Sequence, residues 1–318
     1  MWASLPPFAI FFIGALLVAV VPARLQKGLL LVPVVGGLQL LGIPENHVIV
    51  FPTMGYELVP YRVDRLSLLF GYIFTLAAFI CIVFSLHLRD RIQHVSGLVY
   101  AGSALGAVFA GDLITLFVFW ELAAISSVFL IWARRTPVST SAGWRYLVIQ
   151  LVSGLLLLAG VLLHFNDTGS LAFSYIGTDS LAGWLIFLAF GIKCAFPLLH
   201  NWLTDAYPEA TPTGTVFLSI FTTKMAVYAL TRGFPGTELL IYIGAVMTCF
   251  PIFYAVIEND LRRVLGYSLI NQLGFMVCGI GIGTTLAING AVSHAFSHII
   301  YKALLFMSMG AVLHMTGK

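Results

Sequence analysis

The sequence predicts an all-α polytopic membrane protein with about eleven transmembrane helices, and two observations carry this prediction. Hydrophobic residues make up 60% of the 318 residues and charged residues 9%, whereas soluble domains carry about 25% charged residues. The mean hydropathy is accordingly high, at +0.99. Apolar runs of about 20 residues, long enough to cross roughly 30 Å of hydrocarbon, follow one another along the chain. We therefore treat residues 1–318 as a single transmembrane domain.

The expected spans can be placed to within a few residues. The first is a span and not a signal peptide, because it lacks a basic n-region and further spans follow at once. Between the second and third spans, the pieces HVIVF and ELVPYRV predict a small extramembrane hairpin or loop within 44–64. The spans are 4–21, 27–43, 66–86, 93–110, 113–133, 143–165, 181–197, 213–231, 238–257, 264–282 and 286–313.

Lysine and arginine in the connections predict the orientation, because cytoplasmic loops are enriched in them. With the N-terminus outside, the outer connections hold three such residues, Arg62, Arg65 and Arg232. The inner connections hold ten, namely Arg24, Lys27, Arg89, Arg91, Arg134, Arg135, Arg145, Arg262, Arg263 and Lys318. We expect the N-terminus outside and the chain in a bacterial cell (inner) membrane.

Four charged residues lie well inside spans: Lys193, Lys224, Lys302 and Glu121. Charges at bilayer depth are costly and usually functional. Lysine and glutamate can exchange a proton, whereas arginine remains protonated in proteins. The deep charges are all of the kind that can carry a proton.

The span that carries Lys193 is predicted to break. Pro197 follows four residues later, has no N–H to donate to the Lys193 carbonyl, and its ring clashes with that carbonyl. Transporters build ion sites at such broken helices. The alternative is a proline kink whose lysine extends to the membrane surface.

Glu121 is the deep acid available to neutralise Lys193, so we expect the two to approach each other. A lysine beside a carboxylate holds its proton, and one separated from it in a dry interior tends to release it. A static ion pair that aligns helices is the alternative.

Lys224 also lies near the middle of its span, where Thr222, Thr223 and Tyr228 are local hydroxyl groups. A structural lysine bonded to these hydroxyls is the alternative to a functional one.

His294, His298 and Lys302 recur at i, i+4 and i+8 and therefore line one helix face. Histidine is a good proton relay partner for lysine, and Ser293, Ser297 and Tyr301 make this region polar enough for water. A metal pair is disfavoured, because the next residue on the face is a cation and the nearby residues offer no carboxylate.

Two further polar groups flank the spans. His200, Asp205 and Glu209 follow the expected break and form a solvated vestibule or a loop anchor. Glu258 and Asp260, beside Arg262 and Arg263, are expected to fix a helix end at the membrane surface.

The remaining composition excludes several classes. The four cysteines lie singly, without a CxxC or His/Cys pattern, so no cofactor or metal site is expected in this chain. Redox cofactors would have to lie on another subunit. The net charge of +3 comes without a basic run, so nucleic acid is not a partner.

Five motifs resemble one family, the antiporter-like membrane subunits shared by Mrp-type sodium/proton antiporters, the membrane arm of respiratory complex I and membrane-bound hydrogenases. The sequence around Lys193 and Lys224 looks most like that of the D-type member of the Mrp antiporters. The motifs are FWELAAISS, GIKCAFPLLHNWLTDAYPEATPTG, TTKMAVYALTRGFPG, ENDLRRVLGYSLINQLG and SHAFSHIIYKALLFMSMGAVL.

The resemblance implies two inverted five-helix repeats, each with one broken helix. Here 93–231 would be the complete first repeat and 238–318 an incomplete second one, because the chain ends before the second broken helix. It also implies a proton path through Glu121 and Lys193, then Lys224, then His294, His298 and Lys302. The implied partners are other membrane subunits, H⁺ with Na⁺ as a further candidate, and the lipid bilayer.

The family pattern differs at two positions: Arg262 replaces a usual lysine and Thr204 a usual proline. Two alternatives to an antiporter subunit remain. One is a membrane-arm proton-pumping subunit of a redox complex, of NADH-quinone oxidoreductase or hydrogenase type, with the catalytic chemistry on other chains. The other is a transport-inactive structural subunit.

Overall fold

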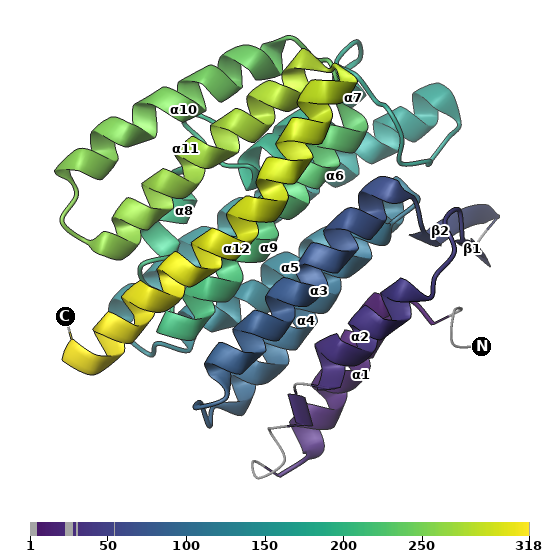
Figure 1. Cartoon of the computed structure of the whole chain (residues 1–318). Helices are drawn as coiled ribbons and strands as arrows, with labels where there is room; N and C mark the ends of the chain where they lie inside the picture. Colours follow the sequence, from purple (N-terminus) through teal and green to yellow (C-terminus); the bar gives the residue numbers. More distant parts are fainter. Residues whose placement is uncertain (1–4, 23–27, 30, 54, 318) are drawn as a thin grey trace.

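The computed structural model describes residues 5–22, 28–29, 31–53 and 55–317. This part of the chain contains twelve helices and one two-stranded hairpin (Figure 1). They are α1 (Pro7–Val20), α2 (Leu31–Leu41), β1 (Val48–Thr53), β2 (Tyr56–Arg62), α3 (Arg65–Ser85), α4 (Arg91–Phe109), α5 (Leu113–Trp132), α6 (Pro137–Thr168), α7 (Leu181–Lys193), α8 (Asn201–Ala206), α9 (Pro212–Gly233), α10 (Leu239–Ile257), α11 (Leu261–Ile282) and α12 (Thr285–Thr316).

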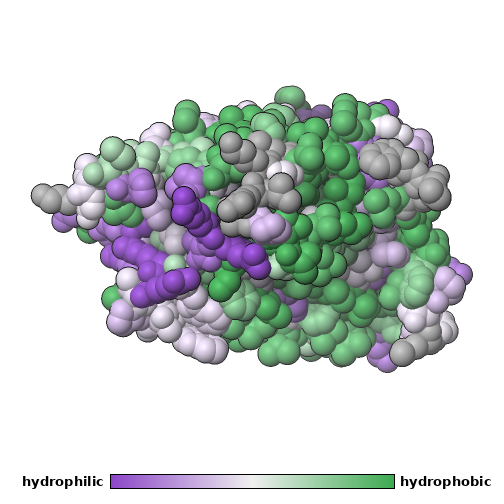
Figure 2. Space-filling view, turned by 90° about the horizontal axis from the view of Figure 1, so that it is seen from below, coloured by the Kyte–Doolittle hydropathy of each residue, from purple (hydrophilic) through white to green (hydrophobic). Residues whose placement is uncertain are grey.

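Each of the eleven expected spans overlaps one apolar helix, so the all-α transmembrane class is confirmed. Among the described residues, eight helices are long and apolar enough to cross a membrane, and α1, α2 and α7 are shorter apolar helices. Residues 4 and 27, where the first two spans were expected to begin, lie outside the described residues. The face drawn in Figure 2 is largely hydrophobic, with its most hydrophilic side chains gathered toward one end, as a membrane-embedded surface requires.

Helix α9 is the central element of the bundle. It packs against α3, α4, α5, α7, α11 and α12, and its most apolar stretch of 18 residues is completely buried. Helices α1 and α2 lie at one edge of the molecule and α10 lies at the opposite edge (Figure 1). A polar side chain in the middle of α9 is therefore enclosed by protein on all sides.

The predicted hairpin is confirmed and is tied to the helices by side chains. Strand β1 pairs antiparallel with β2, with Val48 opposite Arg62. The buried Asp112 carboxylate accepts the Val59 N–H at 2.7 Å, and Arg62 donates to the Phe173 carbonyl at 2.7 Å. These contacts hold the hairpin over the start of α5.

The predicted helix break is confirmed. Helix α7 ends at Lys193, and helical structure resumes in α8 after a connection that contains Pro197. Ala195 and Leu198 take up left-handed backbone conformations there, with φ of 61° and 68°. Trp202 of α8 donates its indole N–H to the Ile192 carbonyl at 2.9 Å, which gives that carbonyl a partner beside the break.

The basic residues separate toward the two ends of the bundle. Arg232, at the end of α9, is 2.8 Å from Asp64, which caps the start of α3, next to Arg62 and Arg65. The ion pairs Arg134–Glu209, Arg135–Asp90, Arg145–Asp205 and Arg263–Glu258 lie at the opposite helix ends. Arg24, Lys27 and Lys318, which also entered the orientation prediction, lie outside the described residues.

Candidate functional site

Lys193 is completely buried at the end of α7 and is held by Trp120 of α5. Its ammonium donates to the Trp120 carbonyl oxygen at 2.6 Å and lies 4.5 Å from the centroid of the Trp120 ring. Within the described part of the chain, Lys193 forms no ion pair with a carboxylate. A backbone carbonyl and an aromatic face therefore hold the amine where an acid was expected.

Glu121 is the next residue on α5 and interacts electrostatically with Lys193. The two residues do approach each other, but they do not form a static ion pair. The carboxyl group lies against Gly154 of α6, in space that a β-carbon at residue 154 would occupy. Its buried Oε1 atom has no hydrogen-bond partner among the described residues. Glu121 is thus placed near Lys193 without being bonded to it.

Lys224 is completely buried in the middle of α9. Its ammonium donates to the Ser219 carbonyl of the same helix at 2.6 Å. The expected hydroxyl partners are directed elsewhere: Thr222 bonds to Tyr100, Tyr228 donates to the Val108 carbonyl, and the Thr223 hydroxyl has no partner in the described part of the chain. Lys224 is therefore bonded to a backbone carbonyl, and the hydroxyl partners expected for a structural lysine were predicted wrongly.

His294, His298 and Lys302 form a row on α12. The rings of His294 and His298 stack with centroids 6.0 Å apart, and His298 is completely buried. Within the described ranges, neither ring nitrogen of His298 has a hydrogen-bond partner. Lys302 donates to the Ser268 hydroxyl at 2.9 Å and to the Leu265 carbonyl at 3.2 Å. Ser293 and Ser297, expected to add polarity to this face, are exposed instead.

The six predicted residues fall into two groups. Glu121 and Lys193 form the first, and the residues of α12 together with Lys224 form the second, since Lys224 interacts electrostatically with both His298 and Lys302. Cys194 is related to both groups, because it follows Lys193 in the chain and interacts electrostatically with Lys224. The arrangement is a row of titratable side chains that runs from α5 through α7 and α9 to α12, and Glu121 and His294 are its partly buried members.

The sequence prediction missed a polar patch on α11 that extends this row. Tyr301 donates to Gln272 at 3.0 Å, Gln272 donates to Asn271 at 2.9 Å, and Asn271 donates to the Thr248 carbonyl of α10 at 2.6 Å. The signal was present in YSLINQLG, where polar residues stand at i, i+3 and i+4 within an apolar run. Such a patch can hold ordered water beside Lys302.

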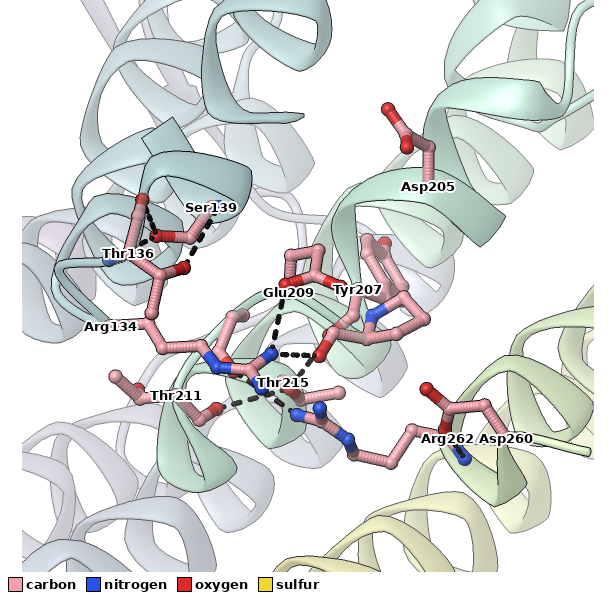
Figure 3. A network of polar contacts seen from close by, with 12 residues as sticks. Arg134, Thr136, Ser139, Asp205, Tyr207, Glu209, Thr211, Thr215, Asp260 and Arg262 are labelled. Atoms are coloured by element: carbon pink, nitrogen blue, oxygen red, sulfur yellow. Dashed lines mark hydrogen bonds and ion pairs between the residues drawn. The ribbon is translucent and has the colours of Figure 1, made fainter. Parts of the chain in front are cut away.

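A network of polar contacts surrounds the connection from α8 to α9 (Figure 3). Arg134 pairs with Glu209 at 3.0 Å, Asp205 pairs with Arg145 at 2.7 Å, and Arg262 donates to the Ala210 carbonyl at 3.2 Å. Asp205 and Glu209 are therefore loop anchors. His200 forms no part of this network and packs against Phe250, with ring centroids 4.7 Å apart.

A polar cavity of about 410 Å³ opens beside this network, between α6, α8 and α11. Its lining includes Arg145, Asn201, Asp205, Arg263 and Tyr267. A cavity is thus present beside Asp205, where a solvated vestibule or a loop anchor was expected.

The Glu258 carboxyl, between α10 and α11, fixes the turn at this end of the bundle. It accepts the backbone N–H groups of Asp260 and Asn259 and lies 3.6 Å from Arg263. These contacts hold the pKa of Glu258 below its ordinary value. The hydrogen bond from the Asp260 N–H has the largest effect, and Asn259 and Arg263 add to it. In the described residues, no three His, Cys, Asp or Glu side chains come together as a metal site requires.

Comparisons with known proteins identify relatives of this arrangement. The family model described as NADH:quinone oxidoreductase/Mrp antiporter, TM, matches residues 110–318. The D component of the Na(+)/H(+) antiporter of Alkalihalophilus pseudofirmus is 32% identical over 232 residues, which cover 67% of this chain and 47% of the relative. The N component of the NADH-quinone oxidoreductase of Desulforudis audaxviator is 32% identical over 299 residues, which cover 84% of this chain and 58% of the relative.

A solved structure shares the fold. A chain in the structure of the Mrp complex from Dietzia sp. DQ12-45-1b superposes with a TM-score of 0.83 at 24% identity, covering 96% of this chain and 63% of that chain. The chain thus spans about half the length of the curated relatives it matches.

Proposed function

Because this chain belongs to the NADH:quinone oxidoreductase/Mrp antiporter transmembrane family, we propose that it is a proton-translocating membrane subunit of a multisubunit antiporter. In this proposal it exchanges H⁺ for Na⁺ together with partner subunits, in a bacterial cell membrane with its N-terminus outside. One observation carries the proposal furthest: Lys193 is completely buried at a helix break, close to Glu121 yet not bonded to it.

In the proposed mechanism, Lys193 is the switch. Its flexible side chain reaches the Trp120 carbonyl, as in this structure, and in a second position it would reach the Glu121 carboxylate. Beside the carboxylate the amine holds its proton, and away from it, in a dry interior, the amine releases the proton. The distance between Lys193 and Glu121 therefore controls when the proton moves on.

The released proton passes to Lys224 by way of water near Cys194, and from there to His298, His294 and Lys302. The electrostatic interactions of Lys224 with Cys194, His298 and Lys302 support this order. The unpartnered nitrogens of His298, judged on the described residues, are free to accept and to donate a proton. The cavity beside Asp205 is the proposed inner entrance.

The proposal also divides the bundle. Residues 93–231 would form a complete five-helix repeat, whose broken helix holds Lys193, and residues 238–318 would form part of a second repeat. The position of Lys224 in the central helix α9 supports this division, because α9 contacts both α7 and α12.

A redox-driven complex is the second candidate function. It is favoured by the match to the N component of NADH-quinone oxidoreductase, which is as identical as the antiporter relative and covers more of this chain. In that case the same residues would pump protons, with the oxidoreductase chemistry on other chains. Neighbouring genes distinguish the two functions. Genes for small antiporter components would indicate the antiporter, and genes for iron–sulfur or hydrogenase components would indicate the redox-driven complex.

The test is proton and sodium flux through the assembled complex carrying Lys193→Ala. We expect transport to fall to background, because the variant has no amine at the break. Arg89→Ala is the matched control, since Arg89 is exposed and lies outside the spans. Undiminished transport by Lys193→Ala would refute the proposed function.

A further inference from the structure

Two adjacent residues of α5 lie on two adjacent residues of α6. The Trp120 indole N–H donates to the Ser153 hydroxyl at 3.0 Å, and the Glu121 carboxyl lies against Gly154. The Ser153 hydroxyl in turn donates to the Ala189 carbonyl of α7 at 2.8 Å. One serine therefore fixes the Trp120 ring with respect to both neighbouring helices.

The fixed ring faces the break in α7. Trp120 is completely buried, and its ring packs against Phe190 with centroids 5.1 Å apart, one helical turn before Lys193. From this position it offers the Lys193 ammonium two attractive groups, the carbonyl oxygen at 2.6 Å and the ring face at 4.5 Å. An indole face attracts a desolvated cation more strongly than any other aromatic side chain.

Among the described residues, Glu121 of α5 is the charged group that acts on Lys193 and competes with this contact. On α9, Lys224 interacts with Cys194 and Lys302, and on α6 the Tyr146 hydroxyl bonds to Ser127. The structure thus shows the amine at a neutral site, the carbonyl oxygen and ring of Trp120, with the anionic Glu121 as the competing group.

We propose that Trp120 is a positioning residue that binds the Lys193 ammonium in a position away from Glu121. Ser153 holds the indole ring in the orientation that this binding requires. This inference rests on the proposed function, and it names a residue that influences when Lys193 releases its proton. By attracting the protonated amine away from Glu121, Trp120 sets the pH at which Lys193 loses its proton in the unpaired position.

The test is the pH profile of proton transport by the assembled complex carrying Trp120→Leu, Trp120→Phe or Ser153→Ala. Removing the ring face from Lys193 makes the protonated amine less stable, so the alkaline limb of the Trp120→Leu profile moves to lower pH by about 0.5 to 1.5 units. Trp120→Phe keeps a weaker ring face and gives an intermediate shift. Ser153→Ala frees the ring and gives a smaller shift in the same direction.

Trp132→Leu is the matched control, because Trp132 also lies on α5 and also donates its indole N–H to α6, but to the Thr140 carbonyl at the end of the helix. It lowers the amount of assembled complex and leaves the alkaline limb in place. If Trp120→Leu does not assemble, the graded shifts of Trp120→Phe and Ser153→Ala decide.

If the transport rate of the Trp120 variants falls equally at every pH and the alkaline limb of the profile does not move, Trp120 is a purely structural residue. That result overturns the inference. That result is distinct from failure of the proposed function. In the first case Lys193→Ala abolishes transport while the Trp120 variants keep the wild-type limb, and in the second Lys193→Ala itself transports normally.

Discussion

The Glu121 carboxyl group lies against Gly154, at a point where α6 leaves no space for a β-carbon. Glycine in a helix interior costs roughly 0.5–1 kcal/mol relative to alanine. A glycine at this position is explained by the room it gives to the acid beside Lys193.

Gly154→Ala is therefore expected to displace the Glu121 carboxyl and to reduce proton transport by at least roughly tenfold, because a misplacement of about 1 Å can cost that much or more. Proton flux and complex assembly are measured together. Gly290→Ala on α12 is the control, since a β-carbon there meets no described atom within 4 Å. Wild-type flux in the Gly154→Ala complex would show that the position of Glu121 does not matter.

His298→Leu is expected to change stability and transport in opposite directions. His298 is completely buried, and both its ring nitrogens lack a partner among the described residues. An unsatisfied buried polar group costs about 1–3 kcal/mol. Leucine removes that cost, so the unfolding midpoint in detergent rises, while proton transport is lost. Transport at the wild-type rate would exclude His298 from the path. His87→Leu, at an exposed position, is the control.

Leu198→Gly is expected to stabilise the protein. Leu198 has φ of 68° and a side chain that is 89% exposed. Left-handed conformations cost non-glycine residues roughly 1–2 kcal/mol, and glycine removes this strain at little loss of packing. Thermal unfolding in detergent checks the prediction. Leu199→Gly is the control and is destabilising, because Leu199 packs against the core and does not have a positive φ. A lower midpoint for Leu198→Gly would contradict the strain argument.

Asp64 is expected to make stability fall in acid. Burial alone raises the pKa of Asp64, but the charge of Arg232, the Ser67 N–H and Arg62 outweigh it, so the folded pKa lies below the ordinary value of 3.8. A lowered folded pKa means that the stabilisation is complete above about pH 4 and is lost as the pH falls further.

Arg232→Gln removes the main partner and should flatten this acid dependence, at a cost of about 1–3 kcal/mol at neutral pH. Unfolding followed between about pH 2.5 and pH 7 tests it, with Arg65→Gln as the control at an exposed ion pair. An unchanged acid dependence in Arg232→Gln would assign the effect to other carboxylates.

The spans were predictable because a bilayer sets their length, and the break was predictable because a proline cannot bond to the Lys193 carbonyl. Boundaries were less accurate. Helix α6 begins at Pro137, six residues before the expected span, because Thr136 and Ser139 form a capping box outside the apolar run. The six-residue α8 was missed because so short a helix has no periodicity to detect.

The charged residues inside the spans were predictable from the sequence, but their contacts were not. Counting deep charges indicated Glu121, Lys193, Lys224 and Lys302, since their chemistry is visible in the sequence. Lys193 contacts the backbone carbonyl and the indole ring of Trp120, and Ser153 on another helix holds that ring. Spacing along the chain carries no information about such a contact between helices.

The most direct test of the central claim is proton flux through the complex carrying Lys193→Arg. Arginine keeps the positive charge at the break but does not release a proton in proteins. We predict that transport is lost although the complex assembles, whereas the reverse exchange Arg262→Lys, outside the proposed path, transports normally. Proton transport by Lys193→Arg at the wild-type rate would contradict the claim that Lys193 carries the proton.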